Sequence, residues 1–347
     1  MILEWAFIDL DGTLLNQRKR IPKKNLEILK KYVENNGNIV ITTGRWPISA
    51  LKINKKIENF SNNRNKYLIA MNGANIYDLK ENKIIYEKEI DLKIFNEILE
   101  ETKNYSISAW IYSQKGIQNK TVYSVKIPVK KIISKFNYGK IVELKKRKIK
   151  EDKIFKALFL TWTKKEMNKF VNFLKEKYDK ELSIVKITGK AIEVTAKNTS
   201  KGEAIKIIQK IEKFKLENTV ALGDSQNDLS MFQVCNYKVC FNNEEKNLVD
   251  LANISFKNQS KFDEAFEKYI IPYQNFQKNN STIKLNLNNW YEKFDDQIIK
   301  SYKNFWKYLI NQRNLIIETS FPIWLSKNIF KSFLINKNIS WTNQNFS

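Results

Sequence analysis

Two carboxylates one residue apart close an apolar stretch near the start of the chain. The stretch Phe7–Leu15 begins as an apolar strand that ends in Asp9 and Asp11, and Gly12 then allows a turn. Alternate residues of a strand share a face, so both side chains can converge on one point while Gly12 lets the backbone turn. Two acids this close repel unless a cation lies between them, and Mg²⁺ prefers oxygen ligands. An aspartate can also be the nucleophile in phosphoryl transfer. From the spacing alone, an Asp-rich turn after a buried strand remains an alternative.

A second acidic group follows another apolar stretch much later in the chain. Thr219–Leu222 has the composition of a buried strand, and Asp224, Asn227 and Asp228 come shortly after it. Two carboxylates and an amide therefore follow the C-terminal end of this predicted strand, and Asp9 and Asp11 stand at the end of the first one. A purely structural strand-to-helix turn is the alternative here too, but two such stretches in one chain favour a shared site for a metal and a phosphate.

Polar residues also follow the strand predicted over Asn38–Thr42. Thr43 offers a hydroxyl group and Gly44 offers an approachable backbone N–H, and both suit a phosphate oxygen. The motif is short, so its place after a strand is what gives it weight. Arg45 either contacts a substrate or forms an ion pair at the surface.

A third predicted strand, Tyr67–Met71, ends at Asn72, and helices are predicted after Pro22 and Pro47. Apolar strands separated by helices imply an α/β fold with a parallel sheet covered on both faces. In such sheets ligands bind beyond the carboxyl ends of the strands. We therefore expect the polar residues that follow these strands to lie at one edge of the sheet.

Lys201 occupies an unfavourable position for a cation. Either Ser200 or Thr199 can cap a helix that carries Ile205, Ile208 and Ile211 on one face, so Lys201 falls in its first turn. A positive charge there opposes the helix dipole at a cost of a few tenths of a kcal/mol or so. That cost suggests an anionic partner for Lys201.

The pattern changes from about residue 83. The predicted elements are a helix over Glu89–Lys103, strands over Ser106–Tyr112 and Phe155–Trp162, a helix over Lys164–Tyr178, and a strand pair over Leu182–Thr188 and Ala191–Thr195. They indicate a compact α+β unit inserted between the two halves of the sheet.

In their order along the chain, the motifs at Asp9, Thr43, Lys201 and Asp224 resemble those of the haloacid dehalogenase superfamily of phosphatases. The inserted unit resembles the type IIB cap of its Cof-type members. The resemblance implies a Rossmann-like parallel-sheet core formed by residues 1–82 and 191–271. It implies a C2-type cap over residues 83–190. Residues 272–347 lie outside it, and aromatic residues at helical spacing predict a helical C-terminal extension there.

The resemblance also implies roles for the residues. Asp9 is expected to be the nucleophile and Asp11 the general acid and base, which requires a proton on Asp11 near neutral pH. The expected Mg²⁺ ligands are Asp9, Asp11, Asp224 and Asp228. The expected phosphate- and substrate-binding residues are Leu10, Thr43, Gly44, Arg45, Asn72, Lys201 and Asn227.

Composition excludes several kinds of site. The chain has no histidine, which removes Ser-His-Asp and Cys-His triads, and its two cysteines indicate no disulfide framework. No stretch approaches the ~18 uninterrupted apolar residues of a membrane span, so we expect a cytoplasmic protein without one. The net charge of +24 could serve binding to polyanions, but Lys and Asn are abundant along the whole chain, which favours compositional bias.

The sequence therefore predicts a Mg²⁺-dependent phosphatase acting on small phosphorylated metabolites, such as sugar, nucleotide or cofactor phosphates, with no need for nucleic acid. One alternative is a sugar-phosphate mutase of the same cap class. The other is a protein that binds polyanions or membranes through the basic, aromatic residues 272–347, which could also contact a second copy of the chain.

Overall fold

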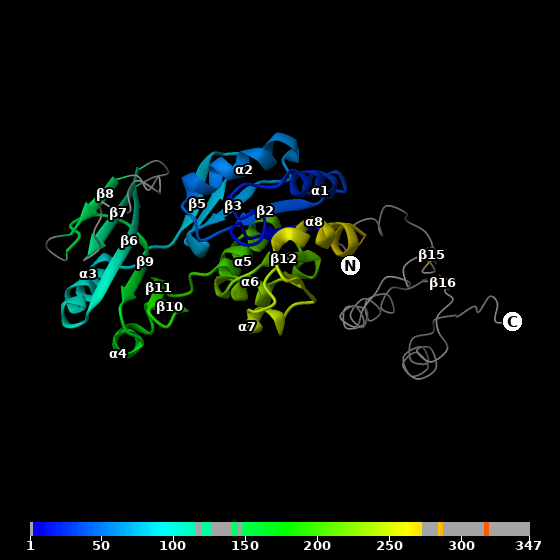
Figure 1. Ribbon diagram of the computed structural model, residues 1–347. Coiled ribbons are helices and arrows are strands. Elements are labelled where there is room, and N and C mark those ends of the chain that lie inside the picture. The colour runs from blue at the N-terminus through cyan, green and yellow to red at the C-terminus, as the bar shows by residue number, and fades with distance from the viewer. Residues whose placement is uncertain are drawn as a thin grey trace.

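The chain forms two units side by side, a larger core unit and a smaller cap unit (Figure 1). A computed structural model describes residues 3–115, 119–125, 140–144 and 148–272, and the short segments 284–286 and 316–318. The α/β architecture predicted from the sequence, a parallel-sheet core with an inserted unit, is confirmed.

The core unit is built on an eight-stranded sheet in the order β14-β13-β12-β1-β2-β3-β4-β5. Its strands from β14 to β3 pair in parallel, and β4 and β5 add antiparallel at one edge. Their bounds are β1 (Trp5–Ile8), β2 (Asn38–Thr42), β3 (Tyr67–Ala70), β4 (Asn75–Asp78), β5 (Lys83–Glu87), β12 (Thr219–Gly223), β13 (Tyr237–Cys240) and β14 (Ile254–Ser255).

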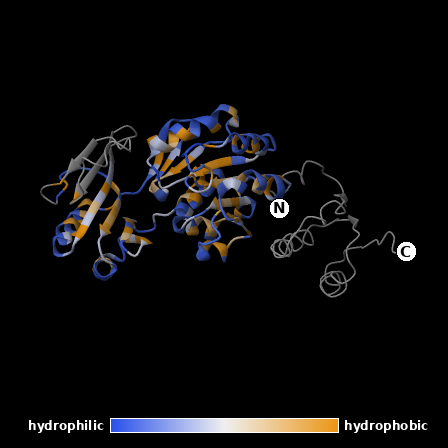
Figure 2. Ribbon diagram, viewed as in Figure 1, coloured by the Kyte–Doolittle hydropathy of each residue, from blue (hydrophilic) through white to orange (hydrophobic). Residues whose placement is uncertain are grey.

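Helices cover both faces of this sheet because alternate strand residues bury on opposite sides. Ala6 and Ile8 pack with α1 (Lys23–Glu34), α2 (Pro47–Ser61) and α8 (Phe262–Ala265). Trp5 and Phe7 pack with α5 (Lys201–Glu212), α6 (Leu229–Val234) and α7 (Lys246–Val249) on the other side. Figure 2 shows the hydrophobic strands enclosed between these largely hydrophilic helices.

The cap unit is a six-stranded sheet in the order β10-β11-β9-β6-β7-β8, with two helices on one face. Its elements are α3 (Leu92–Glu101), β6 (Ile107–Lys115), β7 (Asn119–Val125), β8 (Lys140–Glu143), β9 (Ile154–Thr161), α4 (Lys164–Tyr178), β10 (Leu182–Thr188) and β11 (Ala191–Ala196).

The boundaries predicted between the units need correction. We placed them at 82/83 and 190/191, but β5 pairs with β4 in the core sheet and β11 pairs with β9 in the cap sheet. The chain therefore crosses between the units after β5 and again after β11. Sequence reasoning missed this because a hairpin strand has the same composition in either sheet.

The C-terminal extension is described only at β15 (Lys284–Asn286) and β16 (Ile316–Glu318), which pair in parallel. The helices predicted in 272–347 and most of the basic run 145–148 lie outside the described residues. In the part of the chain that is described, we find no helix long and apolar enough to span a bilayer.

Two isoleucines of α5 differ in how deeply their side chains are buried. Ile208 is fully buried whereas Ile211, which we expected on the same buried face, is 50% exposed. Ile208→Ala should lower the free energy of unfolding by about 2–5 kcal/mol, because it leaves a cavity in the core. Ile211→Ala should cost less than about 1 kcal/mol. Urea denaturation of both variants measures the difference, and equal losses would contradict the packing described for α5.

Candidate active site

The candidate site lies at the switch point of the core sheet, where successive strands are added to opposite sides of β1. From the central strand β1 the chain moves to β2 and β3 on one side, and it later returns to β12 on the other side of β1. The carboxyl ends of strands flanking such a switch form a natural crevice for ligands. Asp9 follows β1, Thr43 follows β2, and Asp224 follows β12, so the chain reversal brings these distant positions to one edge.

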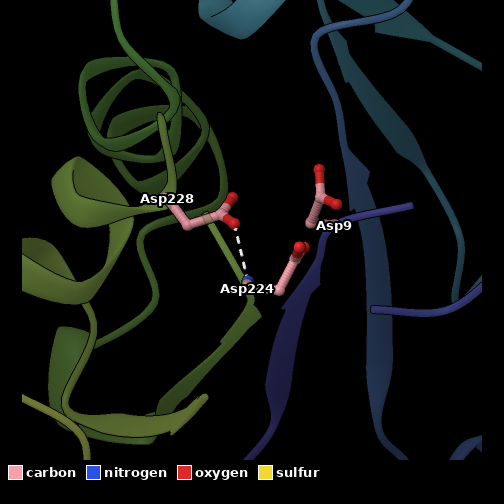
Figure 3. Close-up of side chains that lie close together, drawn as sticks. All are labelled: Asp9, Asp224 and Asp228. Atoms are coloured by element: carbon pink, nitrogen blue, oxygen red, sulfur yellow. Dashed lines mark hydrogen bonds between the residues drawn. The ribbon is translucent and has the colours of Figure 1, made fainter. Parts of the chain in front are cut away.

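Three carboxylates converge at this edge. Asp9, Asp224 and Asp228 each contribute an oxygen, and these atoms lie within 4.8 Å of one another (Figure 3). Asp9 is 4% exposed and Asp228 is fully buried. Oxygen ligands from several carboxylates are the set that Mg²⁺ binds in proteins, so the residues present fit the predicted ion. The carboxylate of Asp11, the fourth predicted ligand, is not in this group.

Lys201 bridges two of the three carboxylates. Its fully buried ammonium group donates to Asp9 Oδ1 at 2.6 Å and to Asp228 Oδ1 at 2.5 Å. Ser200 caps α5 by accepting from the Glu203 backbone N–H, which fixes Lys201 in the first turn. Lys201, whose charge opposes the dipole of α5, therefore has the anionic partners that the sequence predicts for it.

Asp228 supports the loop that carries Asp224. Its Oδ2 accepts from the backbone N–H groups of Asp224 at 2.9 Å and of Ser225 at 3.0 Å. With Oδ1 bound to Lys201, both oxygens already have donors. Asp9 and Asp224 are consequently the better candidates for direct contact with a metal ion, and Asp228 holds the loop in place.

Thr13 and Gly12 complete the surroundings of Asp224. The Thr13 hydroxyl donates to Asp224 Oδ1 at 3.0 Å. Gly12 has a φ of +86°, and a Cβ there would lie 2.2 Å from Asp224 Oδ2. Glycine is therefore required both for the turn and for the approach of Asp224. Sequence reasoning assigned no role to Thr13, although its place directly after the Asp9–Gly12 turn was the available signal.

Burial and mutual repulsion change the proton affinities of this cluster. Burial raises the pKa of Asp9 well above its ordinary value, and Asp228 and Asp224 add to the rise despite the opposing charge of Lys201. Burial and the charge of Asp228 raise the pKa of Asp224 to about 7. For Lys201, burial disfavours the charge, but attraction to Asp228 and Asp9 outweighs it and raises its pKa. The cluster thus contains more negative charge than one lysine balances.

Asp11 is held by two cations. Arg45 donates to it through Nε at 2.6 Å and through a second guanidinium nitrogen at 2.7 Å, and Lys19 donates at 2.7 Å. Partial burial alone would raise the pKa of Asp11, but the hydrogen bonds from Arg45 and Lys19 lower it below its ordinary value. The structure thus differs from the expectation that Asp11 carries a proton near neutral pH. Sequence reasoning left the partner of Arg45 open and did not identify Lys19.

The remaining predicted residues form a polar wall beside Asp9. Thr43 is 1% exposed, and its hydroxyl accepts from the Arg45 backbone N–H at 3.2 Å. Asn227 Nδ2 donates to Asn72 Oδ1 at 3.0 Å. A Cβ on Gly44 would lie 2.8 Å from the same Asn72 oxygen, so Gly44 allows this close approach.

Leu10 differs from the other predicted binding residues. Its side chain is fully buried in the core cluster on the α1 and α2 side. It can therefore contact a ligand only through its backbone. The structure brings together the other predicted residues around the ends of β1, β2, β3 and β12.

Comparisons with known proteins find relatives of this chain. A family model described as haloacid dehalogenase-like hydrolase matches residues 6–270. A Mycoplasma pneumoniae protein named "Putative phosphatase" is 30% identical over 265 residues, which covers 72% of this chain and 89% of that relative. A protein of the same name from Buchnera aphidicola subsp. Baizongia pistaciae is 28% identical and covers 74% of this chain and 92% of its own length.

A solved structure shares the fold. It belongs to a sugar phosphatase of HAD subclass IIB, is 22% identical, and superposes with a TM-score of 0.63 over 77% of this chain and 98% of that one.

The excess negative charge of Asp9, Asp224 and Asp228 predicts that the free energy of unfolding depends on pH. The pKa of Asp224 is about 7 in the folded chain against an ordinary value of 3.8, so between these pH values the folded chain binds a proton that the unfolded chain has lost. Stability without metal should therefore fall as the pH rises through this window, by up to about 1.4 kcal/mol per pH unit for one proton. Mg²⁺ competes with that proton, so its stabilising effect should grow with pH.

Thermal unfolding with and without Mg²⁺, from about pH 5 to about pH 8, measures both effects. Asp224→Asn should flatten the pH dependence and reduce the effect of Mg²⁺, whereas Asp250→Asn on the exposed surface should change neither. An unchanged profile in Asp224→Asn would contradict the assignment of the charge excess to this cluster.

Proposed function

Since this chain belongs to the haloacid dehalogenase-like hydrolases, we propose that it is a Mg²⁺-dependent phosphatase of small phosphorylated metabolites that acts through an aspartyl-phosphate on Asp9. Family membership confirms the resemblance noted in the sequence, and with it a hydrolase of the phosphatase type. The observation that carries the proposal is the buried contact of Lys201 with Asp9 beside Asp224.

The contact with Lys201 orients the proposed nucleophile. Lys201 binds Asp9 Oδ1, so Oδ2 is the oxygen that attacks phosphorus. As the new bond between phosphorus and Asp9 forms, the ester bond to the leaving group breaks, and the leaving oxygen takes a proton from Asp11. A water molecule then attacks phosphorus, gives a proton to Asp11, and the bond to Asp9 breaks. The two steps together release the leaving alcohol and free phosphate and return Asp9 and Asp11 to their starting states.

The proton on Asp11 depends on its two cations. Arg45 and Lys19 stabilise the ionised form, which suits the second step, in which Asp11 is the base. For the first step Asp11 must be protonated, so we propose that a bound phosphate ester draws Arg45 and Lys19 toward its own oxygens. Withdrawal of these cations would restore a higher pKa to Asp11.

The other residues serve the phosphoryl group. Thr43, Gly44, Asn72 and Asn227 offer a hydroxyl group, a backbone N–H and amide groups beside Asp9, and Lys201 offsets charge on the nucleophile. Asp9 and Asp224 would hold Mg²⁺, with Asp228 supporting the loop. When bound, the ion would offset negative charge on the phosphoryl oxygens.

The core unit and the cap unit would have different roles. We place the protein in the cytoplasm, with the core unit performing the chemistry and the cap unit closing over it to exclude water. No observation on the described residues favours the mutase or the polyanion-binding alternative.

Replacement of the nucleophile tests the proposal. Asp9→Asn should lower Mg²⁺-dependent hydrolysis of p-nitrophenyl phosphate by at least ~10³-fold, because the amide cannot form the covalent intermediate. Asp250→Asn, an exposed aspartate outside the cluster, is the matched control and should retain full activity. Circular dichroism confirms that both variants are folded. Activity that survives Asp9→Asn would refute the assigned nucleophile, and an isomeric phosphate ester in place of free phosphate would indicate a mutase.

A further inference from the structure

A polar pocket lies on the core unit, outside the cluster of carboxylates. Its walls come from residues 16–22, which lead into α1, and from residues 258–260, which lead into α8. Lys24 of α1 joins the two walls, because its ammonium group donates to the Ser260 backbone carbonyl and to Asp263 Oδ1, both at 2.7 Å. The pocket has a volume of about 480 Å³, within the range of roughly 300–1,000 Å³ that sites for small organic molecules have.

The pocket is lined by cationic and neutral polar groups. Its charged lining residues are Arg18 and Lys24, and no acidic residue lines it in the described part of the chain. Lys24 is paired with Asp263, whereas Arg18 has no carboxylate partner among the residues that the structure describes. Four carboxamides supply further donors and acceptors, those of Asn16, Gln17, Asn258 and Gln259. This lining favours an anion over a cation or a neutral ligand.

A tight turn connects the pocket to the active site. The Asn16 backbone carbonyl accepts from the Lys19 N–H at 2.9 Å, and the Asn16 side chain accepts from the Arg20 N–H at 3.1 Å. Lys19 has a φ of +57°, a left-handed conformation that is uncommon for a residue with a side chain. With this backbone, Arg18 lines the pocket while Lys19 donates to Asp11 Oδ1 at 2.7 Å. Two consecutive cations of one turn therefore serve the two places.

We propose that this pocket binds a small organic anion through Arg18, and that the bound anion holds the turn in the conformation that places Lys19 against Asp11. An anionic carboxylate or phosphonate can accept two parallel hydrogen bonds from the guanidinium group. The carboxamides would bind the rest of the molecule, since each offers both a donor and an acceptor. The volume of the pocket favours an organic molecule over a bare ion.

The consequence for activity rests on the proposed function. There, a bound phosphate ester draws Lys19 toward its own oxygens, so the turn has to change when the substrate binds. An anion that fixes the turn opposes this change and weakens substrate binding, and by linkage the substrate weakens binding of the anion. The pocket would then be an inhibitory site, separate from the chemistry at Asp9.

Isothermal titration calorimetry on the full chain tests the pocket. The probe is 3-phosphonopropionate, which carries a carboxylate and a phosphonate and is not hydrolysed. Mg²⁺ is omitted, so that the carboxylates of Asp9 and Asp224 repel anions from the active site. We expect the wild type to bind the probe and Arg18→Gln to raise Kd by ~10-fold or more, because a charged hydrogen bond is lost. Inorganic phosphate should bind ~10-fold more weakly than the probe, because it forgoes the hydrogen bonds of the carboxamides.

Arg20→Gln is the matched control. Arg20 belongs to the same turn and, among the described residues, also has no carboxylate partner, but it does not line the pocket. Its replacement should leave Kd unchanged. Equal losses in the two variants would indicate general attraction by surface charge, and equal affinity for phosphate would indicate a site for a bare ion. Either result, or a wild type that does not bind the probe, would overturn the pocket.

Hydrolysis of p-nitrophenyl phosphate with Mg²⁺ tests the effect on activity. The probe should raise the KM of the wild type several-fold. Arg18→Gln should keep its basal activity and show no such rise. An unchanged KM in the wild type, or an equal rise in Arg18→Gln, would overturn the coupling to the active site. If the wild type hydrolyses no phosphate ester, the proposed function and the coupling fail together, whereas the calorimetry still decides whether the pocket binds an anion.

Discussion

The buried ammonium group of Lys201 is the interaction on which the site depends. It joins Asp9, which follows β1, to Asp228, which follows β12, although these residues are 219 positions apart in the chain (228 − 9). A buried charge without a partner costs several kcal/mol, on the order of 3–5 for a broken buried pair, so each of these groups requires the others. Three carboxylates against one lysine leave an excess of negative charge, and that excess would favour the binding of a divalent cation.

The second constraint is the double crossing of the chain between the two units. Because the chain enters the cap after β5 and leaves it after β11, the cap sheet is tethered beside the edge of the core sheet where the site lies. Lys156 of β9 donates to the Gly44 backbone carbonyl and Glu193 of β11 accepts from Asn72, so the cap contributes charged groups to the loops beside the carboxylates. In this arrangement the core would determine the reaction, and the cap would determine which leaving group fits.

Much of the site could be predicted from the sequence, for a physical reason. Asp9, Thr43 and Asp224 directly follow apolar strands, and parallel strands present their carboxyl ends at one edge. The ion pair of Asp11 with Arg45 and Lys19 could not be predicted, since long side chains reach partners that spacing does not fix. The contacts of Lys156 with Gly44 and of Glu193 with Asn72 could not be predicted either, because a charged residue on a strand ordinarily indicates the face that meets solvent. Here both side chains meet loops of the core unit.

In the proposed site, Asp9, Thr43, Lys201 and Asp224 surround one phosphoryl group together with Mg²⁺. A crystal structure of the protein with Mg²⁺ and beryllium fluoride, which mimics a phosphoryl group on a carboxylate, would show whether they do. We expect beryllium bonded to the Asp9 carboxylate, Mg²⁺ against Asp224, and fluorine atoms within about 3 Å of Thr43 and Lys201. Beryllium fluoride bound elsewhere, or Mg²⁺ without contact to Asp224, would refute this arrangement.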